Sequence, residues 1–278
     1  MNIDNYLQRI AYGGSTEPNF ATLQSIHRHH CLAIPYENID VIMQTPVSRN
    51  LENIHEKIVT KVRGGWCYEM NGLLGWALEA LGFKVTPLCG GVMRSQFGDA
   101  ALANHLVLRI DLEHSWIADS GLGDGILEPL PLVAGSYRQR GSDYTLEQLE
   151  EGSWRFHNRT GSMPPDYDFF NQRADEALLD KQCAHLQQDP ESMFRKNLIC
   201  QLMTENGGYG LLGKVLTNQE TGERRYLIDG EDLREVLVTS FKLVPPPLQG
   251  LWELVERRHV ELFGDKSVDE ISIGSPMS

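Results

Sequence analysis

The sequence predicts an α+β fold with a helical N-terminal region, a central antiparallel sheet or small barrel, and a mixed C-terminal region. Three observations lead to this prediction. Apolar residues recur at helical spacing in the first third of the chain, they alternate at strand spacing after Leu106, and short apolar runs between Gly and Pro fill residues 85–167. Such runs are typical of antiparallel sheets and small barrels.

Helical spacing defines the elements of the first region. Three segments with spaced apolar side chains predict helices, at residues 5–10, 21–32 and 51–58. A further predicted helix in this region begins at Cys67 and carries one apolar stripe over about four turns. Gly82 supplies its stop.

A change to alternating spacing predicts two adjacent strands. The apolar side of the first strand consists of Leu106, Leu108, Ile110 and Leu112. Residues 115–119 form the second predicted strand. The C-terminal part of the chain predicts a helix at 174–186, short strands at 209–216 and 224–228, and a last helix at 248–263.

Length and charge limit the classes of function. At 278 residues the chain has room for about two domains. Its 41% hydrophobic and 23% charged residues are usual for a globular protein. With 25 basic and 38 acidic side chains, its net charge of −13 repels phosphate backbones and anionic membranes. We therefore expect no nucleic-acid or membrane partner.

The cysteines and the first residues indicate the compartment. Five cysteines are scattered along the chain without a C-x-x-C pair, so neither a disulfide scaffold nor a structural zinc site is expected. No run approaches the ~18 apolar residues of a membrane span, and the first residues lack the charged-then-apolar pattern of a secretory signal. These features predict a cytoplasmic protein.

Cys67 is a candidate nucleophile because it opens the predicted helix directly after Gly64 and Gly65. Its sulfur would lie near unpaired backbone N–H groups and the positive end of the helix dipole, a place that lowers the pKa of a thiol, especially beside a histidine. The two glycines would give the turn the freedom to present the sulfur at the helix tip. The alternative is a small buried residue without a chemical role.

His105 and Asp119 are the candidate base and orienting acid. His105 starts the first predicted strand, on the face opposite its leucines, and Asp119 ends the second strand. If a three-residue loop joins the strands, the two side chains lie diagonally on one face, within reach of each other. A two-residue loop would place them on opposite faces. Cysteine, histidine and aspartate together can supply a nucleophile, a base and its orienting carboxylate.

The motifs that contain these residues resemble the arylamine N-acetyltransferase family, in a form that suits a bacterial member. The segment Arg63-Gly-Gly-Trp-Cys67-Tyr-Glu-Met-Asn71 is similar to the highly specific R-G-G-aromatic-C-x-E-x-N signature of that family. Five further segments between Ile34 and Leu216 are similar to family motifs in the same order: Ile34-Pro-Tyr-Glu-Asn-Ile-Asp40, Asn104-His105-Leu-Val-Leu, Asp119-Ser-Gly-Leu-Gly123, Asp189-Pro-Glu-Ser-Met-Phe194 and Glu205-Asn-Gly-Gly-Tyr209.

The resemblance implies three regions and a papain-like arrangement of the site. Residues 1–83 would form a helical bundle that carries the nucleophile, residues 84–190 a β-barrel that carries the base and acid, and residues 191–278 a smaller α/β lid. In this arrangement Cys67 is the acetylated nucleophile, His105 its base and Asp119 the orienting acid.

The sequence departs from the family at three positions near the site. Leu122 stands where the family has Phe in the acceptor pocket, Asn104 replaces Thr, and Ser120 replaces Val. Loss of the aromatic ring would widen the pocket, so we expect the chemistry to be retained and the acceptor range to change. Tyr68, Asn104, Leu122 and Gly123 match family positions around the site and are the predicted acceptor- and CoA-binding residues.

The resemblance implies an acetyl-CoA-dependent N-acetyltransferase of arylamines and arylhydrazines that works by a ping-pong route. Cys67 would take the acetyl group from acetyl-CoA, the acceptor would then attack acetyl-Cys67, and the Cys67 amide would help to stabilise the oxyanion. An amide synthase that releases a polyketide chain as a macrolactam is an alternative, as is a papain-like peptidase or transglutaminase. A binding module with an inert cysteine is the alternative from another class.

Two other groups of residues suggest different chemistry. His27, His30 and Cys31 share a face of a predicted helix, and they are read either as a metal site or as a solvated helix flank; no metal is predicted. Gly121, Gly123 and Gly125 stand at alternate positions, and their spacing does not match the glycine motif of dinucleotide-binding sites. They predict either a phosphate cradle or a tight turn.

Overall fold

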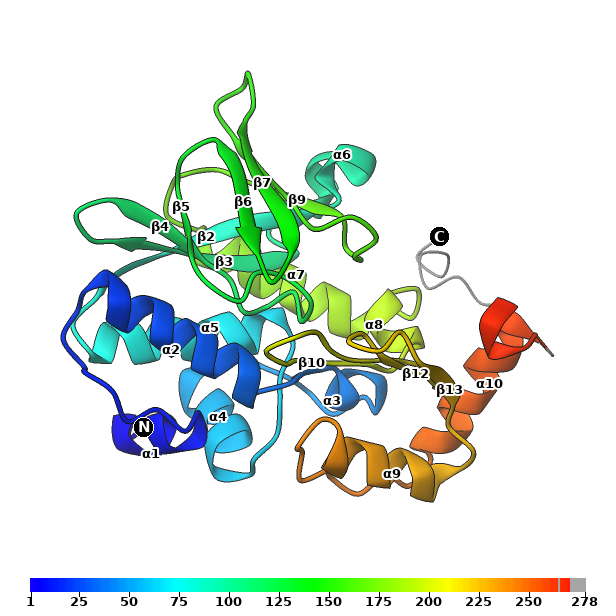
Figure 1. Cartoon of the computed structure of the whole chain (residues 1–278). Coiled ribbons are helices and arrows are strands. Elements are labelled where there is room, and N and C mark those ends of the chain that lie inside the picture. The colour runs from blue at the N-terminus through cyan, green and yellow to red at the C-terminus, as the bar shows by residue number, and fades with distance from the viewer. Residues whose placement is uncertain (265, 271–278) are drawn as a thin grey trace.

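Helices of the N-terminal third pack against an eight-stranded antiparallel sheet in the computed structural model, which describes residues 1–264 and 266–270 (Figure 1). A second, five-stranded sheet lies beside them with the last two long helices. Within the described residues, no helix is both long and apolar enough to cross a lipid bilayer.

Three of the helices in the N-terminal third begin where an asparagine side chain caps the first turn. The helices of this region are α1 (Ile3–Arg9), α2 (Phe20–Ala33), α3 (Ile39–Ile42), α4 (Leu51–His55) with the π-helical turn η1 (Glu56–Thr60), and α5 (Cys67–Ala80). The side chains of Asn2, Asn19 and Asn50 accept hydrogen bonds from N–H groups at the start of α1, α2 and α4. Helix α5 runs through the middle of the core between the other helices and strands β2 to β4 (Figure 1). It ends before Gly82, whose φ is +87°.

Eight strands form the larger sheet. In the order of the chain they are β2 (Lys84–Val92), β3 (His105–Asp111), β4 (Ser115–Ala118), β5 (Leu130–Pro131), β6 (Gly135–Gln139), β7 (Ser142–Gln148), β8 (Trp154–His157) and β9 (Asp166–Phe169). Their order in the sheet is β5-β4-β3-β2-β9-β8-β7-β6, and every pair is antiparallel. Side chains from seven of these strands meet in one buried cluster inside the curled sheet. The sheet is therefore a nearly closed barrel, which confirms the predicted fold class.

The hairpin of β3 and β4 has the three-residue loop that brings the candidate base and acid to one face. Asp111 pairs with Ser115, and Leu108 pairs with Ala118. Continued along the chain, this register places His105 and Asp119 diagonally on the same side. Side chains on the other side of β3, such as Ile110, pack into the helical core, as the alternation predicts.

The second sheet combines a short N-terminal strand with four C-terminal strands. In spatial order these are β1 (Tyr36–Glu37), β10 (Ile199–Met203), β11 (Gly208–Leu212), β12 (Val215–Asn218) and β13 (Arg224–Tyr226). Strand β1 joins the N-terminal region to this sheet because it pairs with β10. The single strand predicted at 209–216 is wrong: it is two strands, with Gly213 at φ +56° in the turn between them.

Helices complete the structure around both sheets. They are α6 (Arg94–Phe97) and η2 (Gly98–Ala101) between β2 and β3, α7 (Glu176–Gln188) and α8 (Met193–Lys196) after the barrel, α9 (Gly230–Thr239), α10 (Leu251–Phe263) and η3 (Val268–Glu270). Helices α7 and α10 match the predicted segments within a few residues. Helix α9 was not predicted, and it packs with α10 against the second sheet.

Candidate active site

Cys67 is the first residue of α5. The chain segment that leads into Cys67 is held in place by close packing against β1. The N–H of Glu37 donates to the carbonyl oxygen of Gly65 at 2.9 Å. A Cβ on Gly64 would overlap the carbonyl oxygen of Pro35, and one on Gly65 would lie 2.7 Å from the Cβ of Glu69. Neither glycine has a positive φ. The two glycines are therefore needed for close approach of the chain, and not for the backbone freedom that the sequence suggested.

Cys67 is buried in the wall of a cavity. It is 4% exposed, and its Sγ lies 3.9 Å from the carbonyl oxygen of Asn104. Burial raises the pKa of the Cys67 thiol, and the nearby Cys183 and Asp119 act in the same direction, although the N–H groups of two neighbouring residues lower it. The expected lowering of this pKa by the helix N-terminus is thus wrong, because burial outweighs it. A thiolate here needs a base that takes the proton.

His105 remains the candidate for that base. Its ring is buried, and Nε2 lies 2.9 Å from Oδ2 of Asp119. The other ring nitrogen, Nδ1, remains for a partner, and His105 lines the same cavity as Cys67. The aromatic ring of Tyr167 packs at 5.2 Å from the imidazole and limits its rotation. The structure thus brings together the three residues predicted from the sequence.

Asp119 is held as a carboxylate by its hydrogen bonds. Oδ1 accepts from Nδ2 of Asn71 at 2.7 Å and from the N–H of Gly121 at 2.8 Å. Burial alone would raise the pKa of Asp119, but the charge of His105 and these hydrogen bonds lower it overall. An ionised carboxylate is what an imidazole needs to keep one tautomer and to carry a positive charge.

Asn71 joins helix α5 to β3 and to the loop that follows β4, a role that sequence reasoning missed. Its Nδ2 also donates to the carbonyl oxygen of Leu106 at 2.6 Å, and its Oδ1 accepts from the N–H of Ser120 at 2.8 Å. The signal was present in the sequence, because Asn71 follows Cys67 by four residues and so lies one helical turn above it on the same face.

The loop after Asp119 passes directly over the start of α5. A Cβ on Gly121 would lie 2.7 Å from Nδ2 of Asn71 and 3.1 Å from the Cβ of Cys67, so only glycine fits there. Because the N–H of Gly121 donates to Asp119, it is already used and is not free to bind a phosphate.

The cavity of about 490 Å³ lies between the barrel, the second sheet and helices α7 and α8. Its walls are mostly apolar. One part of the cavity wall is polar. There Asp124 forms an ion pair with Arg159 at 2.5 Å and accepts a hydrogen bond from Nε2 of Gln219 at 3.3 Å. Of the predicted binding residues, Asn104 and Leu122 line the cavity.

The structure places the other two predicted binding residues behind the cavity wall. Tyr68 is buried, packs edge-on against Trp66 and donates its hydroxyl to the carbonyl oxygen of Ala103 at 2.7 Å. Gly123 has φ +73°, and a Cβ there would meet the side chain of Gln201. These residues support the wall, and neither is among the cavity-lining residues.

The suggested metal-binding trio does not converge on one point. Nδ1 of His30 is 2.9 Å from the hydroxyl of Tyr6, while both nitrogens of His27 bond to main-chain atoms of the barrel. Cys31 lies 3.7 Å from Nδ1 of His27. Over residues 1–264 and 266–270, no group of three or more His, Cys, Asp or Glu side chains is arranged to hold a metal ion.

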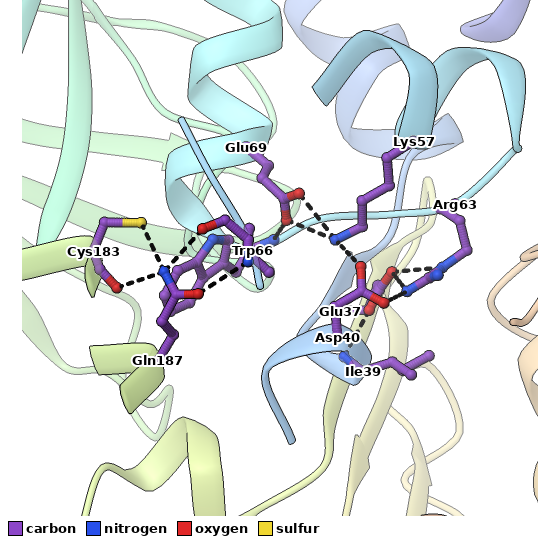
Figure 2. Close-up of polar contacts among 10 residues, drawn as sticks. Glu37, Ile39, Asp40, Lys57, Arg63, Trp66, Glu69, Cys183 and Gln187 are labelled. Carbon is purple, nitrogen blue, oxygen red and sulfur yellow. Dashed lines mark hydrogen bonds and ion pairs between the residues drawn. The ribbon is translucent and has the colours of Figure 1, made fainter. Parts of the chain in front are cut away.

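A buried charge network lies under the start of α5 (Figure 2). Lys57 contacts Glu69 at 2.8 Å and Asp40 at 2.9 Å, and Arg63 contacts Asp40 at 3.0 Å and Glu37 at 2.7 Å. Burial lowers the pKa of Lys57, but the surrounding carboxylates raise it overall, so the ammonium stays charged.

This network reaches Trp66, the residue next to Cys67. Glu69 is 3% exposed, and its Oε2 accepts a hydrogen bond from the N–H of Trp66 at 3.2 Å. Trp66 is the N-cap of α5 and directly precedes Cys67. The network therefore fixes the first turn of the helix that carries the thiol.

Replacing Lys57 with Met is expected to destabilise the protein strongly. Glu69 would then be buried without a cation, which costs about 3–5 kcal/mol. Urea denaturation measures the change in the free energy of unfolding. As a control, Lys61→Met removes an exposed lysine that lies 3.8 Å from Glu56, and it should cost less than about 0.5 kcal/mol. Equal losses in the two variants would contradict the role of Lys57.

Comparisons with known proteins agree with one another. A family model described as N-acetyltransferase matches residues 19–246. The chain is 33% identical to a pineal gland isozyme of arylamine N-acetyltransferase from Gallus gallus, over 87% of this chain and 94% of that protein. It resembles the solved arylamine N-acetyltransferase of Salmonella typhimurium with a TM-score of 0.82 and 27% identity, over 92% and 98% of the two chains. It also resembles the Mycobacterium marinum arylamine N-acetyltransferase solved in complex with CoA, with a TM-score of 0.81 and 25% identity, over 92% and 98%.

Proposed function

Because the chain belongs to the arylamine N-acetyltransferase family and is an acetyltransferase, we propose that it moves an acetyl group from acetyl-CoA to an aromatic amine or hydrazine by way of Cys67. The observation that supports this most is the placement of Cys67 and the His105–Asp119 pair on one cavity. The Mycobacterium marinum relative was solved in complex with CoA, which supports acetyl-CoA as the acetyl donor.

In the first half-reaction Cys67 becomes acetylated. His105 takes the thiol proton, and the sulfur attacks the thioester carbonyl of the donor. The main-chain N–H of Cys67 lies at the open start of α5 and serves as a donor to the oxyanion. The bond between the acetyl carbon and the CoA sulfur then breaks, and CoA leaves as a thiol with the proton from His105.

In the second half-reaction the acceptor takes the acetyl group. Its nitrogen attacks the carbonyl of acetyl-Cys67, His105 takes the proton that the nitrogen loses, and that proton returns to the departing sulfur. Asp119 keeps the imidazole in one tautomer and stabilises its charged form through the 2.9 Å hydrogen bond. The largely apolar cavity suits an aromatic ring, and the burial of Cys67 limits competing attack by water.

We place this reaction in the cytoplasm. All five cysteines are free thiols, Cys67 among them, and a reducing compartment keeps such thiols available.

An exchange experiment without acceptor tests the ping-pong route. Labelled CoA should exchange into acetyl-CoA, and initial-rate plots with both substrates should be parallel. If the exchange required the acceptor, the acetyl group would pass directly from acetyl-CoA to the acceptor. That result would contradict a thioester intermediate on Cys67. An amide synthase is distinguished by its donors, because it would react with long acyl thioesters and not with acetyl-CoA.

Leu122→Phe is expected to change the acceptor range without changing the first half-reaction. Leu122 lines the cavity, and a phenyl ring at that position would occupy space that a large acceptor needs. We expect kcat/KM for a two-ring arylamine to fall roughly tenfold relative to aniline. The rate of Cys67 acetylation, measured by rapid quench and mass spectrometry, should stay the same. An unchanged ratio between the two amines would contradict this placement of the acceptor.

A further inference from the structure

His27 of helix α2 is a fully buried imidazole that bonds to both ends of the loop after β4. Its Nε2 lies 3.1 Å from the main-chain nitrogen of Asp119, and its Nδ1 lies 3.0 Å from the main-chain oxygen of Leu127. The loop between these residues carries Gly121 and Leu122 along the cavity. His27 itself is not among the residues that line the cavity.

These two contacts require one protonation state of His27. A main-chain N–H only donates and a carbonyl oxygen only accepts, so Nε2 must be bare and Nδ1 must carry hydrogen. Burial lowers the pKa of His27, although the carbonyl oxygen of Leu127 and the charge of Asp119 act in the opposite direction. The ring is therefore neutral, and a protonated ring would lose its contact with Asp119.

The sheet does not hold the main chain of Asp119. The pairing of β3 with β4 ends at Ala118, one residue earlier. Within the described part of the chain, His27 is the partner of the Asp119 N–H. Asn71 and Gly121 fix the carboxylate, whereas His27 fixes the backbone from which that carboxylate extends.

We propose that His27 is a positioning residue for acetyl transfer: its neutral imidazole fixes the main chain of Asp119, and thereby the orientation of His105, without contacting either substrate. This inference rests on the proposed function. It also gives a role to the buried His27 on the face of α2 that had suggested a metal site. Because His105 acts in both half-reactions, a displaced Asp119 lowers kcat, whereas the cavity and the substrate KM values stay unchanged.

Two amide substitutions separate this role from a general role in the core. Counted in bonds from Cβ, the side-chain nitrogen of Asn reaches as far as Nδ1 of His, and the side-chain oxygen of Gln reaches as far as Nε2. His27→Asn therefore keeps the donor to Leu127 and loses the acceptor for the Asp119 N–H. His27→Gln keeps the acceptor for Asp119 and loses the donor to Leu127. Each variant loses one buried hydrogen bond, so their melting temperatures should fall by similar amounts.

Steady-state kinetics with acetyl-CoA and aniline give the result. We expect kcat of His27→Asn to fall roughly 10²-fold with unchanged KM, and kcat of His27→Gln to stay within about threefold of the wild type. Equal kcat values in the two variants, or a change confined to KM, would overturn the positioning role. If the wild type forms no acetyl-Cys67, the proposed function itself fails; if it does and the variants are equal, only the role of His27 fails.

A measurement on the wild type keeps the inference testable if His27→Asn does not fold. Nitrogen-15 chemical shifts of the His27 ring should show a neutral imidazole with hydrogen on Nδ1 throughout the pH range in which ordinary histidines titrate. A ring that titrates in that range, or that carries its hydrogen on Nε2, would overturn the assignment.

Discussion

A Cys67→Ser variant is expected to lose acetyl transfer by roughly 10⁴-fold or more, since removal of a catalytic nucleophile has effects of this size in enzymes that use a similar triad. The hydroxyl would occupy the place of the thiol at the start of α5, next to the carbonyl oxygen of Asn104. A hydroxyl loses its proton far less readily than a thiol, and burial at this site already raises the pKa of the thiol. Turnover of acetyl-CoA with aniline measures the loss.

A second cysteine provides the matched control for this experiment. Cys89 is half-buried on β2, donates to the carbonyl oxygen of Asp175 and does not line the cavity. Cys89→Ser should keep turnover close to that of the wild type. If Cys67→Ser also kept near-native turnover while remaining folded, Cys67 would not be the nucleophile.

The second large effect is expected for His105→Gln, which should lower kcat/KM by roughly 10²–10⁴-fold. Glutamine can still donate a hydrogen bond to Asp119, but it cannot take a proton. Because burial raises the pKa of the Cys67 thiol, the variant thiol should be protonated at neutral pH and should react with iodoacetamide only as the pH rises. In the wild type His105 takes the proton, so alkylation should reach its plateau at lower pH.

The pH dependence of alkylation distinguishes these cases. His114→Gln is the control, because His114 is exposed in the turn between β3 and β4 and should leave the profile unchanged. A His105→Gln profile that coincides with that of the wild type would show that the thiolate forms without this imidazole. That result would remove the base from the proposed reaction.

Elements with a strong local pattern could be predicted from the sequence. Helix α5 has a continuous apolar stripe and a glycine stop, and the hairpin of β3 and β4 has strict alternation around a three-residue loop. Strand β1 could not be predicted, because two residues carry no period and its pairing with β10 joins positions more than 150 residues apart. The strand predicted at 209–216 was wrong because the turn at Gly213 interrupts an apolar run.

The placement of Cys67 and the His105–Asp119 pair at one cavity could also be predicted, but the contacts that support it could not. Cys67, His105 and Asp119 lie in recognisable motifs at the ends of elements. The contact of His27 with Asp119 joins residues 92 positions apart and leaves no local signal in the sequence. The direction of the pKa shift at Cys67 was wrong for the same reason, since burial depends on how the whole chain packs around the sulfur.

The mass of the intact protein after incubation with acetyl-CoA alone tests most directly whether Cys67 carries the acetyl group. Wild-type protein should gain one acetyl group, fragmentation should place it on Cys67, and addition of an arylamine should remove it. Cys67→Ala should gain none. A wild-type protein that stays unmodified, or a Cys67→Ala variant that is acetylated to the same extent, would contradict the central role of this thiol.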